Sequence, residues 1–538
     1  MPSESADSPT QYDTATQIGI NRARRHGIGD LLHRTARRHP NKLAIVDGNH
    51  QFTFAEFDVL VNRTAHALGE RGLVKGDRLA LLSHNCWEFA VIAFATARIG
   101  VVLAPINFML TGREVAYILT DSQASAFVAE ESLVPVAQDA LTKTESDVTV
   151  LGQIGGQPPS GWDDVGQWCT SEFSSLADVA IDDDDMIRLM YTSGTESSPK
   201  GVVHTSRSLI SQYVSCAIDG EMSVDDVEIH ALPMYHCVQM DCFFSVDVYL
   251  GATSIILPNP QPEALLATIE SWRVTKLFAP PTVWISLLRC PAFDTTDLSS
   301  LSKGYYGASP MPVEVLNELQ KRLPEVRLWN FYGQTELAPM ATILRPHEQR
   351  EHAGSAGKPA VNVETMVVDD HDKPLPAGQV GEIVHRTPHA TLGYYNNVAK
   401  TAEAFRAGWF HSGDLGVMTE DGYLSVVDRK KDMIKTGGEN VASREVEEAL
   451  YELDEVAEVA VFGIPHPHWI EAVTAAIVAK DGYHIDETAV STHAKVVLAK
   501  YKQPKYVVFV DALPKNPSGK IVKRELREQF GDLSSTET

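Results

Sequence analysis

The chain has 538 residues, of which 44% are hydrophobic, and this predicts a large folded protein and excludes a disordered chain. Its formal net charge of −25 lacks the basic surplus of nucleic-acid-binding proteins, so we expect no nucleic-acid partner. No stretch is long and apolar enough for a transmembrane helix, and the polar N-terminus lacks the apolar core of a secretory signal. The six cysteines form no CxxC motif, which favours reduced thiols and a cytoplasmic location.

Hydrophobic spacing predicts alternating helices and strands in the first part of the chain. After a flexible tail over residues 1–16, we expect a helix at 31–36, a strand at 43–46, a helix at 54–68, a strand at 79–82, a helix at 87–99 and a strand at 101–105. Such alternation implies a mostly parallel sheet covered by helices. The basic patch of arginines 22, 24, 25, 34, 37 and 38 is predicted to be a solvated helix face, with peripheral membrane contact as the alternative.

The middle of the chain begins with a turn-rich segment, 152–175, and an acidic run, 182–185, which together predict a surface excursion. The alternation then resumes, with a strand at 186–190, a helix at 206–217, strands at 229–232 and 254–257, a helix at 262–272 and a strand at 276–279 that ends in a rigid Pro280-Pro281 turn. Short β-type runs at 364–368 and 381–384 predict a small β subdomain. The mixed pattern after about residue 431 predicts a separate domain.

The stretch Tyr191 to Thr205 reads YTSGTESSPKGVVHT, and it contains the first candidate site. Small and hydroxyl residues between Thr192 and Lys200 favour a tight loop whose N–H groups and lysine bind phosphate, although an ordinary surface turn has the same composition. Because Pro199 precedes Lys200 and Gly201 follows it, the Walker A pattern fails. Ser197-x-x-Lys200, with Tyr395-x-Asn397 and Lys435-Thr436-Gly437, leaves a penicillin-binding-type serine hydrolase as an alternative.

Seven further stretches accompany this loop, in order: Pro233-Met234-Tyr235-His236, Tyr306-Gly307-Ala308-Ser309-Pro310, Asn330-Phe331-Tyr332-Gly333-Gln334-Thr335-Glu336, His411-Ser412-Gly413-Asp414, Asp428 to Lys435 (DRKKDMIK), Gly437-Gly438-Glu439-Asn440 and Pro514 to Lys520 (PKNPSGK). Together they resemble the adenylate-forming superfamily of acyl-CoA synthetases, peptide-synthetase adenylation domains and luciferases. The resemblance covers roughly residues 28–527. It departs from the family pattern at Glu196 and Ser197, where Thr and Gly are usual.

The resemblance implies an α/β fold in three parts. A large N-terminal AMP-binding domain, 17–430, is expected to contain doubly wound parallel sheets and a small β-barrel-like subdomain. A small α+β C-terminal domain, 431–538, is expected to act as a mobile lid. Homodimer formation stays open.

The resemblance also assigns roles to individual residues. Lys520, Thr335, Glu336 and His236 are expected to be catalytic, and Thr192 and Glu336 to bind Mg²⁺. The expected nucleotide and CoA contacts are Thr192, Ser193, Gly194, Thr195, Lys200, Gly307, Ala308, Ser309, Asn330, Tyr332, Gly333, Asp414, Arg429, Lys431, Gly437, Gly438 and Glu439.

The implied reaction joins a carboxylic acid to ATP, giving acyl-AMP and pyrophosphate, and then transfers the acyl group to CoA with release of AMP. The expected pocket segments, 235–241, 278–287, 305–309 and 337–342, are mostly apolar and contain no lysine or arginine to pair a second carboxylate. We therefore expect a hydrophobic monocarboxylic acid, with a medium- or long-chain fatty acid as first choice. An aryl acid, an acceptor carrier protein and an amino group paired by Asp241 are the alternatives.

Overall fold

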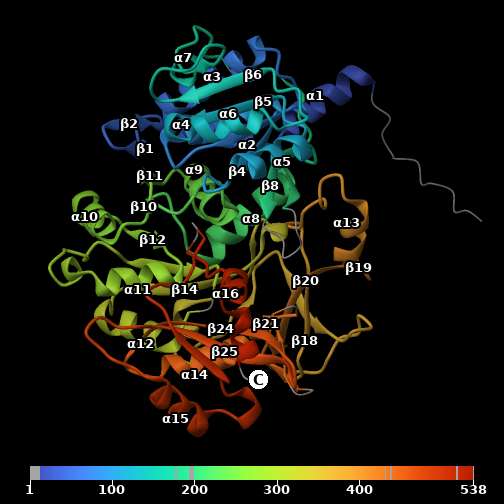
Figure 1. Ribbon diagram of the computed structural model, residues 1–538. Coiled ribbons are helices and arrows are strands. Elements are labelled where there is room, and N and C mark those ends of the chain that lie inside the picture. The colour runs from blue at the N-terminus through green and yellow to red at the C-terminus, as the bar shows by residue number, and fades with distance from the viewer. Residues whose placement is uncertain are drawn as a thin grey trace, which may run out of the picture.

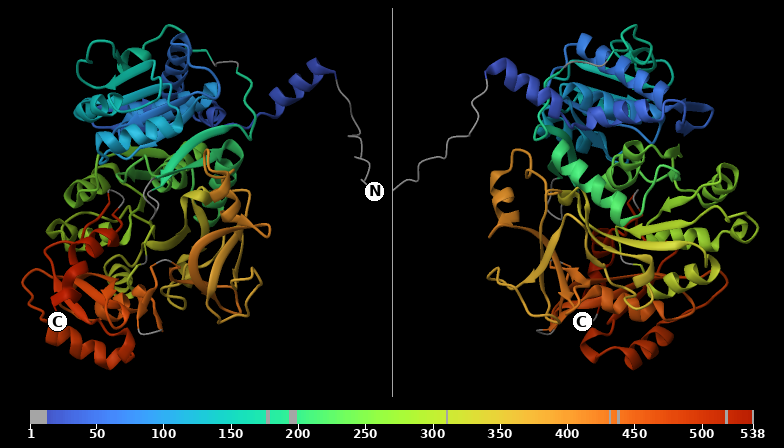
Figure 2. Two further views of the ribbon diagram at one scale, coloured as in Figure 1. Left: turned by 45° about the vertical axis from the view of Figure 1, so that its right-hand side comes forward. Right: turned by 180° about the vertical axis from the view of Figure 1, so that it is seen from behind.

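The computed structural model describes residues 13–175, 179–192, 199–309, 311–430, 432–436, 439–516 and 519–536, whose strands form four β-sheets (Figure 1). Sheets from the first part of the chain occupy the upper and middle regions, and the C-terminal sheet lies below them (Figure 2). The helix α1 (Thr14–Arg24) projects from the body and buries none of its residues. Residues 14–16 therefore belong to a helix, rather than to the tail expected over 1–16.

The upper sheet supports the candidate phosphate loop. Its seven strands are, in spatial order, β7 (Asp163–Asp164), β6 (Val150–Ile154), β5 (Ala126–Glu130), β3 (Arg78–Leu82), β4 (Val102–Ile106), β8 (Met186–Thr192) and β9 (Lys200–Thr205). All neighbouring pairs are parallel except β8 and β9, which form an antiparallel hairpin. The hairpin therefore carries the loop at one edge of an otherwise parallel sheet.

The middle sheet has nine strands. In spatial order they are β16 (Lys358–Pro359), β15 (Met340–Leu344), β14 (Arg327–Gly333), β13 (Lys303–Gly307), β12 (Lys276–Phe278), β10 (Val227–His230), β11 (Thr253–Ile256), β1 (Leu43–Asp47) and β2 (His50–Thr53). The central strands are parallel, and each edge ends in antiparallel strands. Three expected site segments follow or end strands at the carboxyl ends of this sheet, where ligands of open α/β sheets usually bind.

One large apolar core joins the two sheets, because it contains strand residues of both and the helices packed between them. Within it the Phe94 ring of α4 contacts Phe57 and Phe244, at centroid separations of 5.8 and 6.3 Å. The helices of this part are α2 (Ile28–Arg38), α3 (Phe54–Glu70), α4 (Trp87–Ile99), α5 (Gly112–Ser122), α6 (Val134–Leu141), α7 (Val165–Trp168), α8 (Ser206–Asp219), α9 (Ser245–Leu250), α10 (Pro262–Trp272), α11 (Pro281–Arg289) and α12 (Val313–Arg322). This doubly wound arrangement confirms the expected α/β class.

Shorter helical turns connect these elements. One of them is a π-helix, η2 (Val238–Phe244), which directly follows His236 and Cys237. The others are the 3₁₀ turns η1 (Glu131–Leu133), η3 (Pro291–Asp294), η4 (Thr335–Leu337), η5 (Pro346–Glu348), η6 (Lys500–Lys502) and η7 (Gly531–Thr536). Since π turns are rare and occur mostly at functional sites, η2 supports a functional role for the segment beside His236.

The expected small β subdomain is confirmed as a five-stranded antiparallel sheet, beside the helix α13 (Val398–Ala404). Its strands are β17 (Glu364–Val368), β18 (Gly381–Arg386), β20 (Trp409–Met418), β19 (Phe405–Arg406) and β21 (Leu424–Arg429). The strands β20 and β21 pair Asp414 with Arg429, so two expected site residues lie opposite each other.

The C-terminal sheet has its own helices and its own apolar clusters. Its strands are β23 (Glu439–Val441), β22 (Ile434–Thr436), β25 (Ile470–Ala479), β24 (Val456–His466) and β26 (Tyr506–Phe509), and its helices are α14 (Ser443–Tyr451), α15 (Glu487–Val497) and α16 (Lys523–Phe530). Hydrogen bonds join it to the rest, such as Arg289 to the Ala457 carbonyl and Arg444 to the Gly354 carbonyl, at 3.0 and 2.9 Å. The predicted lid motion would have to break such polar contacts.

Two local predictions differ from the structure. The segment 152–175, expected to be an irregular excursion, extends the upper sheet through β6 and β7 and adds α7, because Trp168 and Val165 bury their side chains there. The strand expected at 276–279 is not followed by a separate Pro280-Pro281 turn, because Pro281 occupies the first turn of α11, where its missing N–H costs nothing. No helix of the described residues is long and apolar enough to span a bilayer.

Candidate active site

The candidate phosphate loop joins the two strands of the β8–β9 hairpin, with Thr192 opposite Lys200. Ser193, Gly194 and Thr195, which were expected to bind phosphate, lie outside the described residues. Lys200 Nζ lies 5.5 Å from the centroid of the Tyr394 ring. Because Lys200 begins a strand, it lacks the helical setting that the serine-hydrolase alternative requires.

Glu336 is placed by η4, immediately after Thr335. Its Oε1 accepts a hydrogen bond from the Tyr394 hydroxyl at 2.8 Å, and its main-chain oxygen accepts one from the Thr391 N–H at 2.8 Å. Burial raises the pKa of Glu336, while the Tyr394 hydroxyl and the charges of Arg429 and Lys200 oppose that rise. The Glu336 carboxylate and the Thr192 hydroxyl are the hard oxygen ligands that Mg²⁺ prefers, so both residues fit the metal by chemistry.

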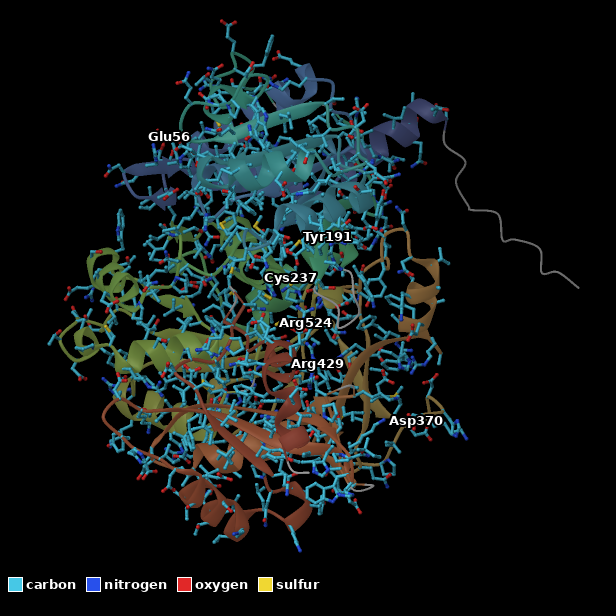
Figure 3. The ribbon with its side chains drawn as sticks, in the orientation of Figure 1. Glu56, Tyr191, Cys237, Asp370, Arg429 and Arg524 are labelled. Atoms are coloured by element: carbon cyan, nitrogen blue, oxygen red, sulfur yellow. The ribbon has the colours of Figure 1, made fainter. Side chains whose placement is uncertain are left out.

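His236 and Cys237 connect the acid-pocket segment to Thr335. The Cys237 Sγ lies 3.4 Å from Thr335 Oγ1, and the His236 Nδ1 accepts a hydrogen bond from the Val238 N–H at 3.2 Å. Burial, followed by the nearby Lys520 charge, lowers the pKa of His236 to about 4. The imidazole is therefore neutral at pH 7. Figure 3 labels Tyr191, Cys237 and Arg429 one below another along the middle of the molecule.

The C-terminal loop that carries Lys520 docks on the large N-terminal part of the protein. The loop is closed locally by Asn516, whose side chain accepts from the Lys520 N–H at 2.9 Å. It docks on the start of α11, where the Thr282 hydroxyl donates to the Gly519 carbonyl at 3.1 Å. Gly519 has a φ of +79°, and an added Cβ would lie 2.6 Å from Thr282 Oγ1, so this docking needs glycine. The structure thus brings Lys520, His236 and Thr335 to one place.

A second group of residues forms a polar surface suited to a nucleoside. The Tyr332 hydroxyl donates to Asp414 Oδ2 at 2.7 Å, and Arg429 Nε lies 3.7 Å from Asp414 Oδ1. Burial and then the Asp414 charge raise the pKa of Tyr332. The structure therefore brings together three residues from β14, β20 and β21 that the sequence predicted as nucleotide contacts.

Glycines let neighbouring backbones approach closely at the ends of β13 and β14. A Cβ on Gly307 would lie 2.2 Å from the Phe331 carbonyl oxygen, and one on Gly333 would lie 1.8 Å from the Pro339 carbonyl oxygen. Ala308, with a φ of +64°, is exposed directly after β13, and Ser309 is half-buried. The Asn330 amide donates to the Ser355 carbonyl at 2.9 Å.

Part of the expected CoA path cannot be placed. Lys431, Gly437 and Gly438 lie outside the described residues. Glu439 is exposed at the start of β23, opposite Thr436. No hydrogen bond or ion pair between described residues links Glu439 to the group around Thr335.

The sequence did not predict a buried ion pair behind the acid pocket. Asp241 on η2 accepts from Arg188 on β8 at 2.6 Å and from the Tyr213 hydroxyl at 2.7 Å. The Asp241 carboxylate therefore has a cation and a phenol as partners within the protein. These partners disfavour the alternative in which Asp241 pairs a substrate amino group. Arg188 and Asp241 are 53 positions apart, and no sequence pattern predicts that they pair. Arg188 also lies outside the expected pocket segments.

One buried acidic group has the composition of a metal site. Glu228, His230 and Asp247 lie within ligand distance of one another. Lys276 Nζ, however, lies 2.8 Å from Glu228 Oε2 and also contacts Asp247 Oδ1. The ammonium group of Lys276 thus already pairs with both carboxylates, and the cluster is a buried ion-pair network.

Positive charge converges on one short segment of the molecule. Lys200 and Arg429 act on Glu336, and Lys520 acts on His236, whose neighbour Cys237 contacts Thr335. Such an arrangement suits a reaction in which two anions must meet. The fold and the site define an ATP-dependent, AMP-forming acid–thiol ligase of the acyl-CoA synthetase type, a class that uses ATP and CoA, typically with Mg²⁺.

The chain belongs to the AMP-binding enzyme family. The model of that family matches residues 32–395, and the model of the AMP-binding enzyme C-terminal domain matches residues 445–520. The two matches contain all four residues that were expected to be catalytic: His236, Thr335, Glu336 and Lys520.

Similar proteins cover nearly the whole chain. The chain is 34% identical over 513 residues to a feruloyl-CoA synthase of Amycolatopsis sp, covering 94% of this chain and 100% of that protein. It is 33% identical over 505 residues to a long-chain-fatty-acid–CoA ligase of Mycobacterium tuberculosis, covering 94% and 98%. A crystal structure of an anthranilate CoA ligase in complex with anthranoyl-AMP has a TM-score of 0.89 at 25% identity, covering 95% and 98%.

Proposed function

We propose that this acyl-CoA synthetase activates a compact aromatic carboxylic acid, with a medium- or long-chain fatty acid as the second candidate. The observation that carries the proposal is a cluster of aromatic rings beneath the expected acid site. This proposal reverses the sequence-based preference, which placed a fatty acid before an aryl acid.

The ring cluster lies at the carboxyl ends of three adjacent strands. Phe278, Tyr305 and Phe331 come from β12, β13 and β14, one to three residues before Ala279, Ala308 and Tyr332, and Phe243 comes from η2. Phe243 stacks on Phe278 and on Phe331 at centroid separations of 4.4 and 5.7 Å, and meets Tyr305 edge-on at 5.4 Å. All four side chains are buried.

Packed rings favour a short acid for a steric reason. A long alkyl chain extending from the reaction centre towards the sheet would have to displace at least one of these rings, and displacing well-packed core side chains costs about 1–3 kcal/mol or more. A planar aryl acid needs less depth and can gain aromatic contacts worth about 0.5–1.5 kcal/mol per pair. The names of the feruloyl and anthranilate relatives support this choice.

The fatty-acid candidate keeps specific support. Tyr235 and Val238, beside His236, are only half-buried apolar side chains, so the acid could extend along η2 instead of towards the sheet. The name of the Mycobacterium tuberculosis relative is that of a long-chain ligase. The fatty-acid metabolism and the cytoplasmic location that the sequence suggested stay predictions.

In the first half-reaction the acid carboxylate attacks the α-phosphorus of ATP, forming acyl-AMP and releasing pyrophosphate. We assign Lys520 to hold the carboxylate and the α-phosphate together, because its charge reaches His236. The neutral His236 can border the carboxylate without adding charge, and the Thr335 hydroxyl can donate to a phosphate oxygen. Thr192 and Glu336 would hold Mg²⁺, which when bound neutralises phosphate charge.

In the second half-reaction the CoA thiol attacks the acyl carbonyl, and AMP leaves. Asp414, Tyr332 and Arg429 would hold the nucleoside through both steps, since the carboxylate can accept from two ribose hydroxyls. Gly438 and Glu439 would line the thiol's path after the C-terminal domain rotates about Lys431. This rotation is a proposal from the family resemblance, and it gives Lys520 and Gly438 different half-reactions.

The test of the acid class is a comparison of kcat/KM for a panel of acids under one set of conditions. Hydroxycinnamic, benzoic and phenylacetic acids should exceed C8 to C16 alkanoic acids by at least about tenfold, the effect of about 1.4 kcal/mol. Higher kcat/KM for C12 or C16 acids would overturn the aromatic assignment. The variant Phe278→Ala, which opens the ring cluster, should shift the preference towards longer acids.

A further inference from the structure

Residues 391–395, which we call the 391–395 strap, cover the outer edge of the phosphate hairpin. Val203 on β9 donates to the Gly393 carbonyl and accepts from the Leu392 N–H, at 3.0 and 3.2 Å. The Tyr395 N–H donates to the Gly201 carbonyl at 2.8 Å. These bonds tie the strap to the strand that leaves the phosphate loop.

The same strap also holds Glu336. Thr391 donates from its N–H to the Glu336 carbonyl oxygen, and its hydroxyl donates to the Val203 carbonyl at 2.6 Å. Tyr394 donates from its hydroxyl to the Glu336 carboxylate. Two hydrogen bonds, one to the main chain and one to the side chain, therefore fix Glu336 relative to β9.

Besides the Glu336 carboxylate, Tyr394 also contacts a positively charged group. Lys200 Nζ lies over the ring at 5.5 Å, within the range of a cation–π interaction. Tyr394 thus lies between a predicted phosphate ligand and a predicted metal ligand.

We propose that Tyr394 is a positioning residue. Its hydroxyl orients the Glu336 carboxylate towards the metal, and its ring holds the Lys200 ammonium group near that carboxylate. The hydroxyl engages only Oε1, and a carboxylate has about four lone-pair positions, so the group can accept from Tyr394 and bind a cation at once. Partners of this kind orient metal ligands, and losing one typically weakens metal binding by about 10–100-fold. The inference rests on the proposed nucleotide-activating function of the same site.

The neighbouring Tyr395 provides a matched control. Its hydroxyl donates to Gln123 Oε1 at 3.1 Å, away from Glu336, and the pair is exposed. Tyr394→Phe and Tyr395→Phe each remove one hydroxyl from one residue of the strap. Tyr394→Phe also keeps the ring under Lys200, so it isolates the bond to Glu336.

The experiment titrates Mn²⁺ into enzyme saturated with α,β-methylene-ATP and follows free Mn²⁺ by electron paramagnetic resonance. We expect the Mn²⁺ dissociation constant to rise about tenfold in Tyr394→Phe and to stay within twofold in Tyr395→Phe. Tyr394→Leu, which also removes the ring, should further weaken binding of the metal-free analogue about threefold. Thermal unfolding of the apo variants checks that each one is folded.

An unchanged Mn²⁺ dissociation constant in Tyr394→Phe, with a clear loss in Glu336→Gln, would overturn the positioning role and leave the proposed function intact. An equal loss in Tyr395→Phe would also overturn it, because the effect would then belong to the strap as a whole. If the unaltered enzyme binds no Mn²⁺ with the analogue, the proposed function itself fails.

Discussion

Replacing Lys520 by alanine should separate the two half-reactions. Burial, followed by the charge of Lys520, lowers the pKa of His236, and Lys520 lies on a loop that is docked at Thr282. Removing the ammonium group should block adenylate formation, where two anions meet. It should spare thioester formation from supplied acyl-AMP, where the account gives Lys520 no part.

The size of the effect follows from the charge lost. A unit charge about 4 Å from a developing anion, at an effective dielectric constant of about 20, contributes about 4 kcal/mol. This corresponds to roughly a thousandfold in rate, at the upper end of what single electrostatic contacts supply in active sites. We therefore expect the adenylation rate to fall about 10²–10³-fold, and the thioester step to change by less than about threefold.

A single-turnover quench experiment measures the rate of acyl-AMP formation. The consumption of CoA with synthetic acyl-AMP measures the rate of the thioester step. Lys515→Ala is the matched control, because Lys515 is in the same loop but pairs with Glu458 at 2.8 Å. An NMR titration adds an independent readout: the pKa of His236 should rise above about 4 in Lys520→Ala, since the neighbouring cation is gone. Equal losses in both half-reactions, or an unmoved His236, would refute the reasoning.

Three further predictions concern the thiol path, the buried pair and acid stability. Gly438→Leu should slow the thioester step by at least about tenfold and spare adenylation, measured by the same two assays. Arg188→Met should lower the unfolding free energy by about 3–5 kcal/mol because it leaves Asp241 buried and unpaired, and Arg188→Met/Asp241→Asn should recover more than half of that loss in urea titrations. Burial lowers the pKa of His385 to about 3, so protonation of the unfolded state costs stability below pH 6.5, and His385→Phe should lose about 2 kcal/mol less than the unaltered enzyme between pH 7 and pH 5.

Each of these predictions can fail separately. Slower adenylation in Gly438→Leu would end its assignment to the thiol path. A double variant as unstable as Arg188→Met would show that Asp241 gains nothing from its cation. The same acid dependence with and without His385 would mean that this imidazole does not stay neutral in the folded state.

The expected active-site residues came from short motifs, whereas the contacts that support them have no such signal. Lys200, Glu336 and Lys520 are far apart in sequence, and the resemblance of their motifs to the adenylate-forming superfamily names all three as expected site residues. The structure relates the three through Tyr394 and His236. The helices expected at 87–99 and 262–272 coincide with the observed bounds of α4 and α10.

Other contacts had no local signal. The Arg188–Asp241 pair forms between two segments that are far apart in the sequence, β8 and η2, and neither residue is unusual within its own segment. The π-helical turn adds one residue per turn to an apolar run, which the sequence cannot distinguish from an α-helix. Tyr394 has no local signal for its role, because that role depends on pairing with β9.

The most direct test of the account follows ATP-dependent pyrophosphate release over aryl acids and C2 to C18 acids, with and without CoA. The account predicts release that requires a hydrophobic acid, continues to full turnover only with CoA, and yields AMP and acyl-CoA in equal amounts. Release without turnover on CoA would indicate a carrier protein as the acceptor. No release with any acid would contradict the assignment of this site to acid activation.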